Sequence, residues 1–167
     1  MKKIIKKILR VCCTYIATKQ AGRICVRGGV KVNFPSKFTK STYIGDNCHF
    51  NGIKISGSGK VVFGNNFHSG KKVRIITSYH NYDNGTKIPY DDSWVTKDVI
   101  IGDNVWCGED VLILAGVTIG EGAVIQAGSV VCKDIPALGI AGGHPAVVFK
   151  YRDKEHYNSL KEKGEFF

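Results

Sequence analysis

The sequence predicts an all-β domain in which the chain winds as a coil with three short strands in each turn. From Val99 onward the chain repeats in sixes, and the first and third residues of each repeat are apolar or small. The other positions are rich in Gly, Asn and Asp, which favour turns. Residues two apart share one face of an extended strand, so a bend after every repeat gives stacked parallel strands around one core.

The predicted core positions run through six consecutive repeats and continue toward the N-terminus. In the six repeats they are Val99 and Ile101, Val105 and Cys107, Val111 and Ile113, Val117 and Ile119, Ala123 and Ile125, and Ser129 and Val131. Earlier in the chain they are Ile44 and Cys48, Val61 and Phe63, Phe67 and Ser69, and Val73 and Ile75. A helix is excluded here, because side chains two residues apart do not share a helical face.

The N-terminal segment differs from the rest of the chain in charge and in period. Residues 1–40 contain eleven Lys and Arg and no Asp or Glu, whereas the remainder is nearly neutral. Ile4, Ile8 and Ile16 fall on a four-residue period among lysines, which predicts a basic amphipathic helix over 1–22. Interspersed charges exclude a signal peptide and a membrane span. Two alternatives stay open: the apolar stripe packs on the domain, or residues 1–20 contact an anionic membrane.

The repeat stops between Ile76 and Val99, and this break predicts a projecting loop over 77–98. Turn-forming residues such as Pro89 fill the segment. Long irregular loops in a compact domain are usually functional or disordered. The loop contains a single histidine, His80, and imidazole suits a general base because it titrates close to neutral pH.

The C-terminal tail, 153–167, predicts a short polar helix with Asp153 near its N-cap. The last turn of a coil leaves an unpaired strand edge. We therefore expect this helix to cover that edge or to dock on a neighbouring chain.

The cysteines and the distribution of charge limit which cofactors and partners we expect. None of the six cysteines forms a C-x-x-C pair, and no Cys and His set has zinc-site spacing. We expect reduced core thiols in a cytoplasmic protein, and no metal. The basic charge is confined to the N-terminal segment and accompanies no nucleic-acid-binding motif, so we expect no nucleic-acid partner.

The repeats resemble those of the hexapeptide-repeat acyltransferases. The specific stretch is IGDNVWCGEDVLILAGVTIGEGAVIQAGSVVCKDIP at 101–136, followed by GGHPA at 142–146, and the resemblance extends over Ile44 to Arg152. It is to the branch of galactoside, maltose and xenobiotic O-acetyltransferases and many polysaccharide O-acetyltransferases. It implies a left-handed parallel β-helix domain over 23–152 that forms a homotrimer. It also implies an O-acetyltransferase that uses acetyl-CoA as acyl donor and a sugar hydroxyl, in surface polysaccharide, as acceptor.

The resemblance implies roles for individual residues. His80 matches the family's general base, and Asn51 matches an acceptor-binding asparagine, with Asp83 as a second acceptor contact. The candidates for a carboxylate that orients His80 are Asp83, Asp91, Asp92 and Glu109. The predicted contacts to coenzyme A are Trp106, Glu109, Ala127, Cys132, Lys133 and Lys150, with the lysines at its phosphates.

Two positions depart from the family pattern and three alternative functions stay open. Cys132 stands where the family usually has threonine. Val147 stands where it usually has Lys or Arg, which removes one phosphate contact that Arg152 could replace. The alternatives are an acetyltransferase for an amino sugar, serine or an antibiotic, a non-catalytic β-helix scaffold, and a zinc hydratase. The histidines of this chain do not have the spacing that the hydratase family shows.

Overall fold

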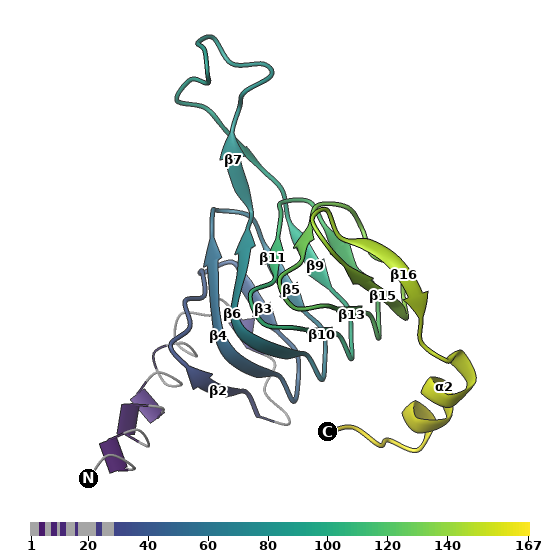
Figure 1. Cartoon of the computed structure of the whole chain (residues 1–167). Helices are drawn as coiled ribbons and strands as arrows, with labels where there is room; N and C mark the ends of the chain where they lie inside the picture. The colour runs from purple at the N-terminus through teal and green to yellow at the C-terminus, as the bar shows by residue number, and fades with distance from the viewer. Residues whose placement is uncertain (1–3, 6–7, 10, 13–15, 17–22, 25–28) are drawn as a thin grey trace.

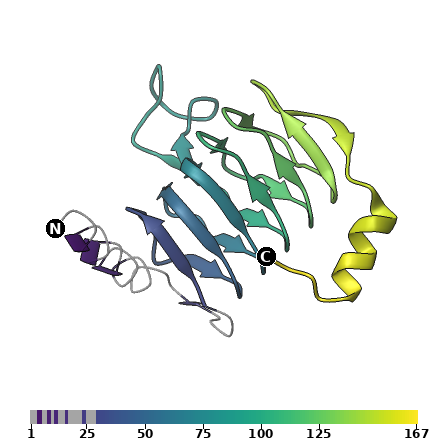
Figure 2. The same cartoon turned by 60° about the horizontal axis from the view of Figure 1, so that its bottom comes forward.

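The computed structural model describes residues 4–5, 8–9, 11–12, 16, 23–24 and 29–167 of the chain. Over residues 29–152 the chain forms a three-sided parallel β-solenoid, with a hairpin projecting from one corner and a helix beyond the last coil (Figure 1). The coils stack in chain order, from the blue N-terminal coils to the yellow-green C-terminal end (Figure 2). This arrangement confirms the coil of parallel strands that the six-residue period predicts.

The first face of the solenoid is one parallel sheet. Its strands are, in hydrogen-bonded order, β1 (Arg23–Ile24), β3 (Thr42–Ile44), β5 (Val61–Phe63), β9 (Val99–Ile101) and β12 (Thr118–Ile119). Each strand takes its place one turn after the strand before it, so residues of the same phase stack directly above one another.

The second and third faces share one sheet, because the long strands β4 and β6 continue around the corner between them. The second face contains β2 (Lys31–Phe34), the first halves of β4 (His49–Ser56) and β6 (His68–Ile76), β10 (Trp106–Cys107), β13 (Val124–Ile125) and β15 (Gly139–Gly142). The third face contains the second halves of β4 and β6, β11 (Leu112–Ile113) and β14 (Val130–Val131). The strand β16 (Val147–Tyr151) pairs antiparallel with β15.

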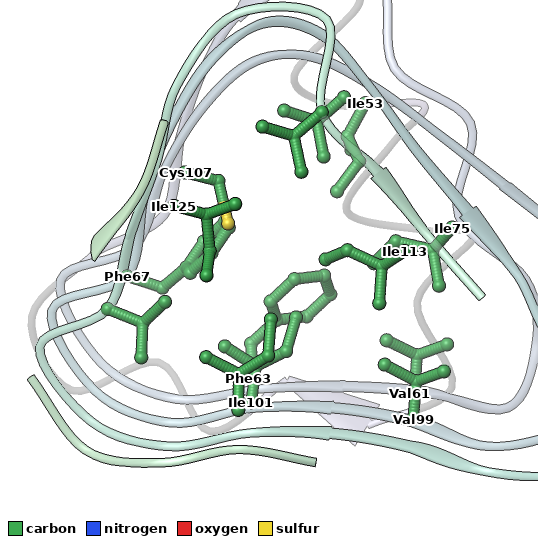
Figure 3. Packing of buried hydrophobic residues seen from close by; sticks show 14 of the residues in the cluster. Ile53, Val61, Phe63, Phe67, Ile75, Val99, Ile101, Cys107, Ile113 and Ile125 are labelled. Carbon is green, nitrogen blue, oxygen red and sulfur yellow. The ribbon is translucent and has the colours of Figure 1, made fainter. Parts of the chain in front are cut away.

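The core fills the inside of the triangle, and the predicted inward positions are confirmed. Every first and third position of the six repeats is buried, as are the earlier ones from Ile44 to Ile75. Phe50, Phe63 and Phe67 meet in the N-terminal half with ring centroids 4.7–5.4 Å apart. Figure 3 shows Phe63 and Phe67 surrounded by aliphatic side chains of successive coils. The polar Ser129 is buried but satisfied, donating to the Gln126 carbonyl and accepting from the Gly143 amide.

The described cysteines are reduced and differ in exposure. Cys48 and Cys107 are buried, and burial raises the pKa of Cys48 to about 11 and that of Cys107 to about 12. Both therefore remain protonated thiols at neutral pH and act as small apolar groups. Cys132 is exposed. The prediction of a core thiol is thus confirmed for Cys48 and Cys107, the two cysteines at predicted inward positions.

A ladder of asparagines lines the corner between the first and second faces. Asn47, Asn66 and Asn104 all have left-handed backbone conformations, with φ between 52° and 59°. The Asn47 amide donates to Asn66 (3.0 Å), and the Asn66 amide donates to Asn104 (2.8 Å). The Asn104 amide then donates to the hydroxyl of Tyr157 (2.8 Å), so the ladder ties the C-terminal helix to the coils.

We expect Asn104→Ala to lower the free energy of unfolding by about 2–3 kcal/mol, because alanine loses the hydrogen bonds of the Asn104 side chain to Asn66, Tyr157 and Glu121 and is strained at positive φ. Asn104→Gly is the matched control, since glycine lacks the same hydrogen bonds but tolerates this backbone. Glycine should recover about 1 kcal/mol of the loss in urea unfolding experiments. An unchanged unfolding midpoint in both variants would contradict a structural role for the ladder.

The C-terminal end differs from prediction in what covers the last coil. The helix α2 (Lys154–Glu162) begins at Asp153, whose side chain accepts from the His156 amide (2.7 Å), which confirms the predicted cap. The helix docks beside the asparagine corner through Tyr157, and Lys161 donates to Glu121 (2.6 Å). The unpaired edge is covered by β16 instead, because an antiparallel strand satisfies the backbone groups of β15 directly.

The described residues of the predicted N-terminal helix, within 1–22, are helical and exposed. They are Ile4, Ile5, Ile8, Leu9, Val11, Cys12 and Ile16. Their apolar side chains are each more than half exposed in the single chain. The remainder of the predicted segment 1–22, apart from these positions, lies outside the described residues. No helix in the described ranges is long and apolar enough to cross a membrane.

Candidate active site

The loop that interrupts the repeat forms a hairpin at the corner between the third and first faces. Its base is an antiparallel pair, β7 (Ser78–His80) and β8 (Trp94–Thr96), in which His80 lies opposite Trp94. The hairpin follows directly on β6 and stands out from the coils (Figure 1). The projecting loop is therefore as predicted, although its base is regular strand rather than irregular chain.

Two aromatic rings hold the imidazole of His80. The Tyr90 ring stacks on it at a centroid distance of 3.8 Å and an angle of 15°, and the Trp94 ring lies 4.0 Å away. Sequence analysis missed both partners, because Trp94 meets His80 only across the hairpin and Tyr90 only through the fold of its tip. His80 is half-buried, and its Nδ1 atom is buried without a hydrogen-bond partner in the described chain. A buried imidazole nitrogen normally has a partner.

Within the described residues, none of the four candidate carboxylates forms a hydrogen bond or an ion pair with His80. Asp91 instead accepts from the amides and hydroxyls of Thr86 and Ser93. These hydrogen bonds, the Ser93 hydroxyl first, hold the pKa of the Asp91 carboxyl well below its usual range. Asp92 lies 3.8 Å from Lys87. Asp91 thus folds the tip of the hairpin that carries Tyr90, whereas stacking rather than a carboxylate orients His80.

The two predicted acceptor contacts lie in different places. Asn51, on β4, accepts from the Asn33 amide (2.8 Å) and donates to the Ser69 carbonyl (2.6 Å). It lines a cavity of about 700 Å³ at the corner between the second and third faces. Asp83 is exposed on the hairpin and does not line that cavity. The structure therefore does not bring Asn51 and Asp83 together within one chain.

The residues predicted to contact coenzyme A are all exposed but fall into separate groups. Trp106 lies on the second face, 55% exposed. Glu109 and Ala127 stack in successive coils at the next corner, where a Cβ on Gly108 would meet the Ala127 amide at 2.5 Å. The remaining three lie apart from these: Cys132 and Lys133 at the opposite edge of the third face, and Lys150 on β16. A single chain thus presents flat walls rather than a closed donor site.

A second cavity, of about 610 Å³, lies between the second face and the C-terminal tail. His68, Trp106 and Phe167 are among its lining residues. The rings of His49 and His68 lie 4.3 Å apart, and Phe167 packs edge-on against both. Burial lowers the pKa of both histidines. No sequence signal predicted this contact, because no periodicity in the tail specifies where its last residues fold back.

The histidine pair predicts a loss of stability in mild acid. The pKa of each imidazole is lower in the folded chain, so its contribution is present above pH 6.5 and is lost as pH falls through the folded pKa. We expect the melting temperature to fall by a few degrees between pH 7.5 and 5.5. His49→Gln/His68→Gln should flatten this dependence, whereas the exposed His156→Gln should not. If the melting temperature depended on pH equally in the two variants, the assignment of the effect to His49 and His68 would be contradicted.

The described residues include no group of three or more His, Cys, Asp or Glu side chains placed to hold a metal ion. The candidate site consists of the hairpin histidine, its two aromatic neighbours and the outer surfaces of the coils.

Comparison with known proteins shows which proteins share these repeats and this fold. Residues 98–133 match the model of the bacterial transferase hexapeptide (six repeats). A hexapeptide-repeat acetyltransferase from Vibrio cholerae O1 biovar eltor, solved with acetyl coenzyme A, has a TM-score of 0.73 and 25% identity, covering 89% of this chain and 86% of that chain. A maltose O-acetyltransferase from Clostridium difficile 630 has a TM-score of 0.66 and 28% identity, covering 90% and 86%.

A galactoside acetyltransferase solved with coenzyme A shares the fold, with a TM-score of 0.69 and 23% identity over 93% of this chain and 83% of that chain. No protein of curated function matches the chain. The chain thus matches hexapeptide repeats over 98–133 and shares its fold with hexapeptide-repeat acetyltransferases. It resembles hexapeptide-repeat acetyltransferases, among them a maltose O-acetyltransferase, as the sequence predicts.

Proposed function

We propose that the protein is an acetyl-CoA-dependent O-acetyltransferase that acetylates a sugar hydroxyl in the biosynthesis of surface polysaccharide, such as capsule or O-antigen. The observation that carries the proposal is His80, an imidazole held between two aromatic rings on a hairpin that projects from flat walls. The relatives support the donor and the acceptor class. One was solved with acetyl coenzyme A, and another is a maltose O-acetyltransferase.

His80 acts as the general base in this reaction. Its imidazole takes the proton of the acceptor hydroxyl while the oxygen attacks the thioester carbonyl of acetyl-CoA. The resulting tetrahedral oxyanion collapses, a new C–O ester bond remains, and the C–S bond breaks. The coenzyme A thiolate leaves and takes the proton from the imidazolium. Tyr90 and Trp94 hold the ring in place, so the chain supplies a positioned base.

We place the site between two copies in a homotrimer. The hairpin whose base contains His80 projects from the coils of its own chain (Figure 1). A neighbouring copy would supply a wall to which the donor binds. On that wall, Trp106 would lie near the thioester, with Glu109 and Ala127 along the pantetheine arm. Lys133 and Lys150 would meet phosphates, and Asn51 would contact the acceptor.

A screen for coenzyme A release tests this function. The full chain is incubated with acetyl-CoA and with free sugars, nucleotide sugars or isolated surface glycans. We expect release above background with a hydroxyl acceptor and a product that mild alkali deacetylates. An alkali-stable amide product would favour an amino-sugar acceptor instead. Release no faster than the background hydrolysis with every acceptor would contradict the acetyltransferase assignment.

We further propose that the N-terminal helix holds this cytoplasmic enzyme at the inner face of the membrane. Its described apolar side chains are exposed, Ile4 at 64% and Ile8 at 57%, and the first 40 residues carry only basic charges. Anionic lipid complements both properties. The full chain should sediment with phosphatidylglycerol vesicles but not with pure phosphatidylcholine vesicles. Ile4→Glu/Ile8→Glu should abolish this binding, and equal sedimentation with both lipids would contradict the proposal.

A further inference from the structure

A column of cations runs along the third face. Lys37 forms a parallel bridge with Lys54, and Lys54 is in register with Arg74 across the β4–β6 pair. Neighbouring strands lie about 4.8 Å apart, so three positively charged residues occupy adjacent positions on successive coils. All three are exposed, whereas the residues beside them in sequence point inward and are buried, such as Ile53 and Val73.

This column has no counter-charge among the residues that the structure describes. Among the described residues, Lys37, Lys54 and Arg74 form no ion pair. Like charges opposite one another on paired strands are destabilising. The free protein therefore carries an electrostatic cost on this face, which a bound anion would remove.

The column borders the 700 Å³ cavity that contains Asn51. The cations that line this cavity are Lys54, Lys71, Lys72 and Arg74, and its one acid is Asp110, 3.8 Å from Lys72. The Lys71 ammonium lies 5.3 Å from the centre of the Phe34 ring. The cavity thus combines an excess of positive charge with an aromatic face and the amide that we assign to the acceptor. This combination fits a polar ligand with several negative charges.

We propose that this cavity binds the diphosphate of a diphosphate-linked sugar, so that the acceptor is a nucleotide- or lipid-linked sugar rather than a neutral free sugar. The proposal rests on the acetyltransferase function above, because Asn51 links the cavity to the acceptor. Arg74 can donate two parallel hydrogen bonds to phosphate oxygens, and the lysines add point charges. A single carboxylate on a glycan would neutralise only one of these cations, whereas adjacent phosphates match several.

Calorimetry with the full chain tests the site without any turnover. The probes are inorganic pyrophosphate, uridine diphosphate and geranyl diphosphate at low salt. All three share the diphosphate and should bind. Tighter binding of uridine diphosphate would indicate a nucleotide-linked acceptor, and tighter binding of geranyl diphosphate would indicate a lipid-linked acceptor. Lys54→Gln/Arg74→Gln should weaken binding by about tenfold or more. Lys154→Gln/Lys163→Gln, which removes the same charge at the C-terminal helix, should leave the affinity unchanged.

A second readout is independent of ligand. Because Lys54→Gln/Arg74→Gln relieves repulsion between paired strands, its melting temperature should equal or exceed that of the wild type. Absence of binding by the wild type, equal affinity in the double variant, or displacement of every diphosphate probe by coenzyme A would overturn the proposal. Coenzyme A release with neutral sugars but no diphosphate binding would overturn this inference alone. Diphosphate binding without coenzyme A release would instead contradict the acetyltransferase function.

Discussion

His80→Ala is expected to lower kcat for acetyl transfer by about 10²–10⁴-fold, because it removes the base that accepts the hydroxyl proton. Coenzyme A release at saturating donor and acceptor measures the effect. The free energy of unfolding should change little, since His80 is half-buried on a projecting hairpin and contributes nothing to the core. The two measurements together separate a catalytic role from a structural one.

His156→Ala is the matched control, because this histidine is exposed on α2 and far from the hairpin in sequence. It should retain wild-type turnover. Tyr90→Leu/Trp94→Leu keeps the base but removes the rings that flank it, and should lower kcat by less than His80→Ala does. Unchanged turnover of His80→Ala on a verified acceptor would contradict the mechanism.

Phe63→Ala is expected to lower the free energy of unfolding by about 3–5 kcal/mol. Phe63 is 2% exposed, and its ring lies 5.2 Å from that of Phe50 and 4.7 Å from that of Phe67. Its removal leaves a cavity where the N-terminal coils are filled by aromatic rings (Figure 3). Such a loss is a large share of the about 5–15 kcal/mol that stabilises a typical domain.

Val62→Ala is the control for this substitution, because Val62 lies on the same strand but points outward and is only half-buried. We expect it to cost less than about 1 kcal/mol in urea unfolding. Equal losses for Phe63→Ala and Val62→Ala would show that the aromatic cluster adds nothing beyond the strand itself.

The coils could be predicted from the sequence, whereas the surroundings of the site could not. The inward positions from Val99 to Val131 follow a strict period, because each repeat must place apolar side chains on one core. The period also locates the hairpin, as the place where it stops, and His80 within it. It cannot specify that Tyr90 and Trp94 flank the imidazole, since those contacts arise from the fold of an insert without a repeat.

The cationic column could not be predicted from the sequence either, because it lies on coils of irregular length. Lys37, Lys54 and Arg74 are unequally spaced in sequence, because neither coil between them has the regular length of three six-residue repeats. Only the strand register shows that they are neighbours. The contacts of α2 could not be predicted for a related reason: the local pattern does not specify which coil a terminal segment meets.

Complementation between inactive variants tests the central claim, that His80 of one copy completes a donor wall on another. His80→Ala and Ala127→Trp, which blocks the exposed wall, are mixed under conditions that exchange subunits. Random trimers would regenerate intact sites between an intact hairpin and an intact wall, so the mixture should recover about a quarter of the wild-type rate of coenzyme A release. A mixture that forms mixed trimers but stays as inactive as either variant alone would contradict the shared site.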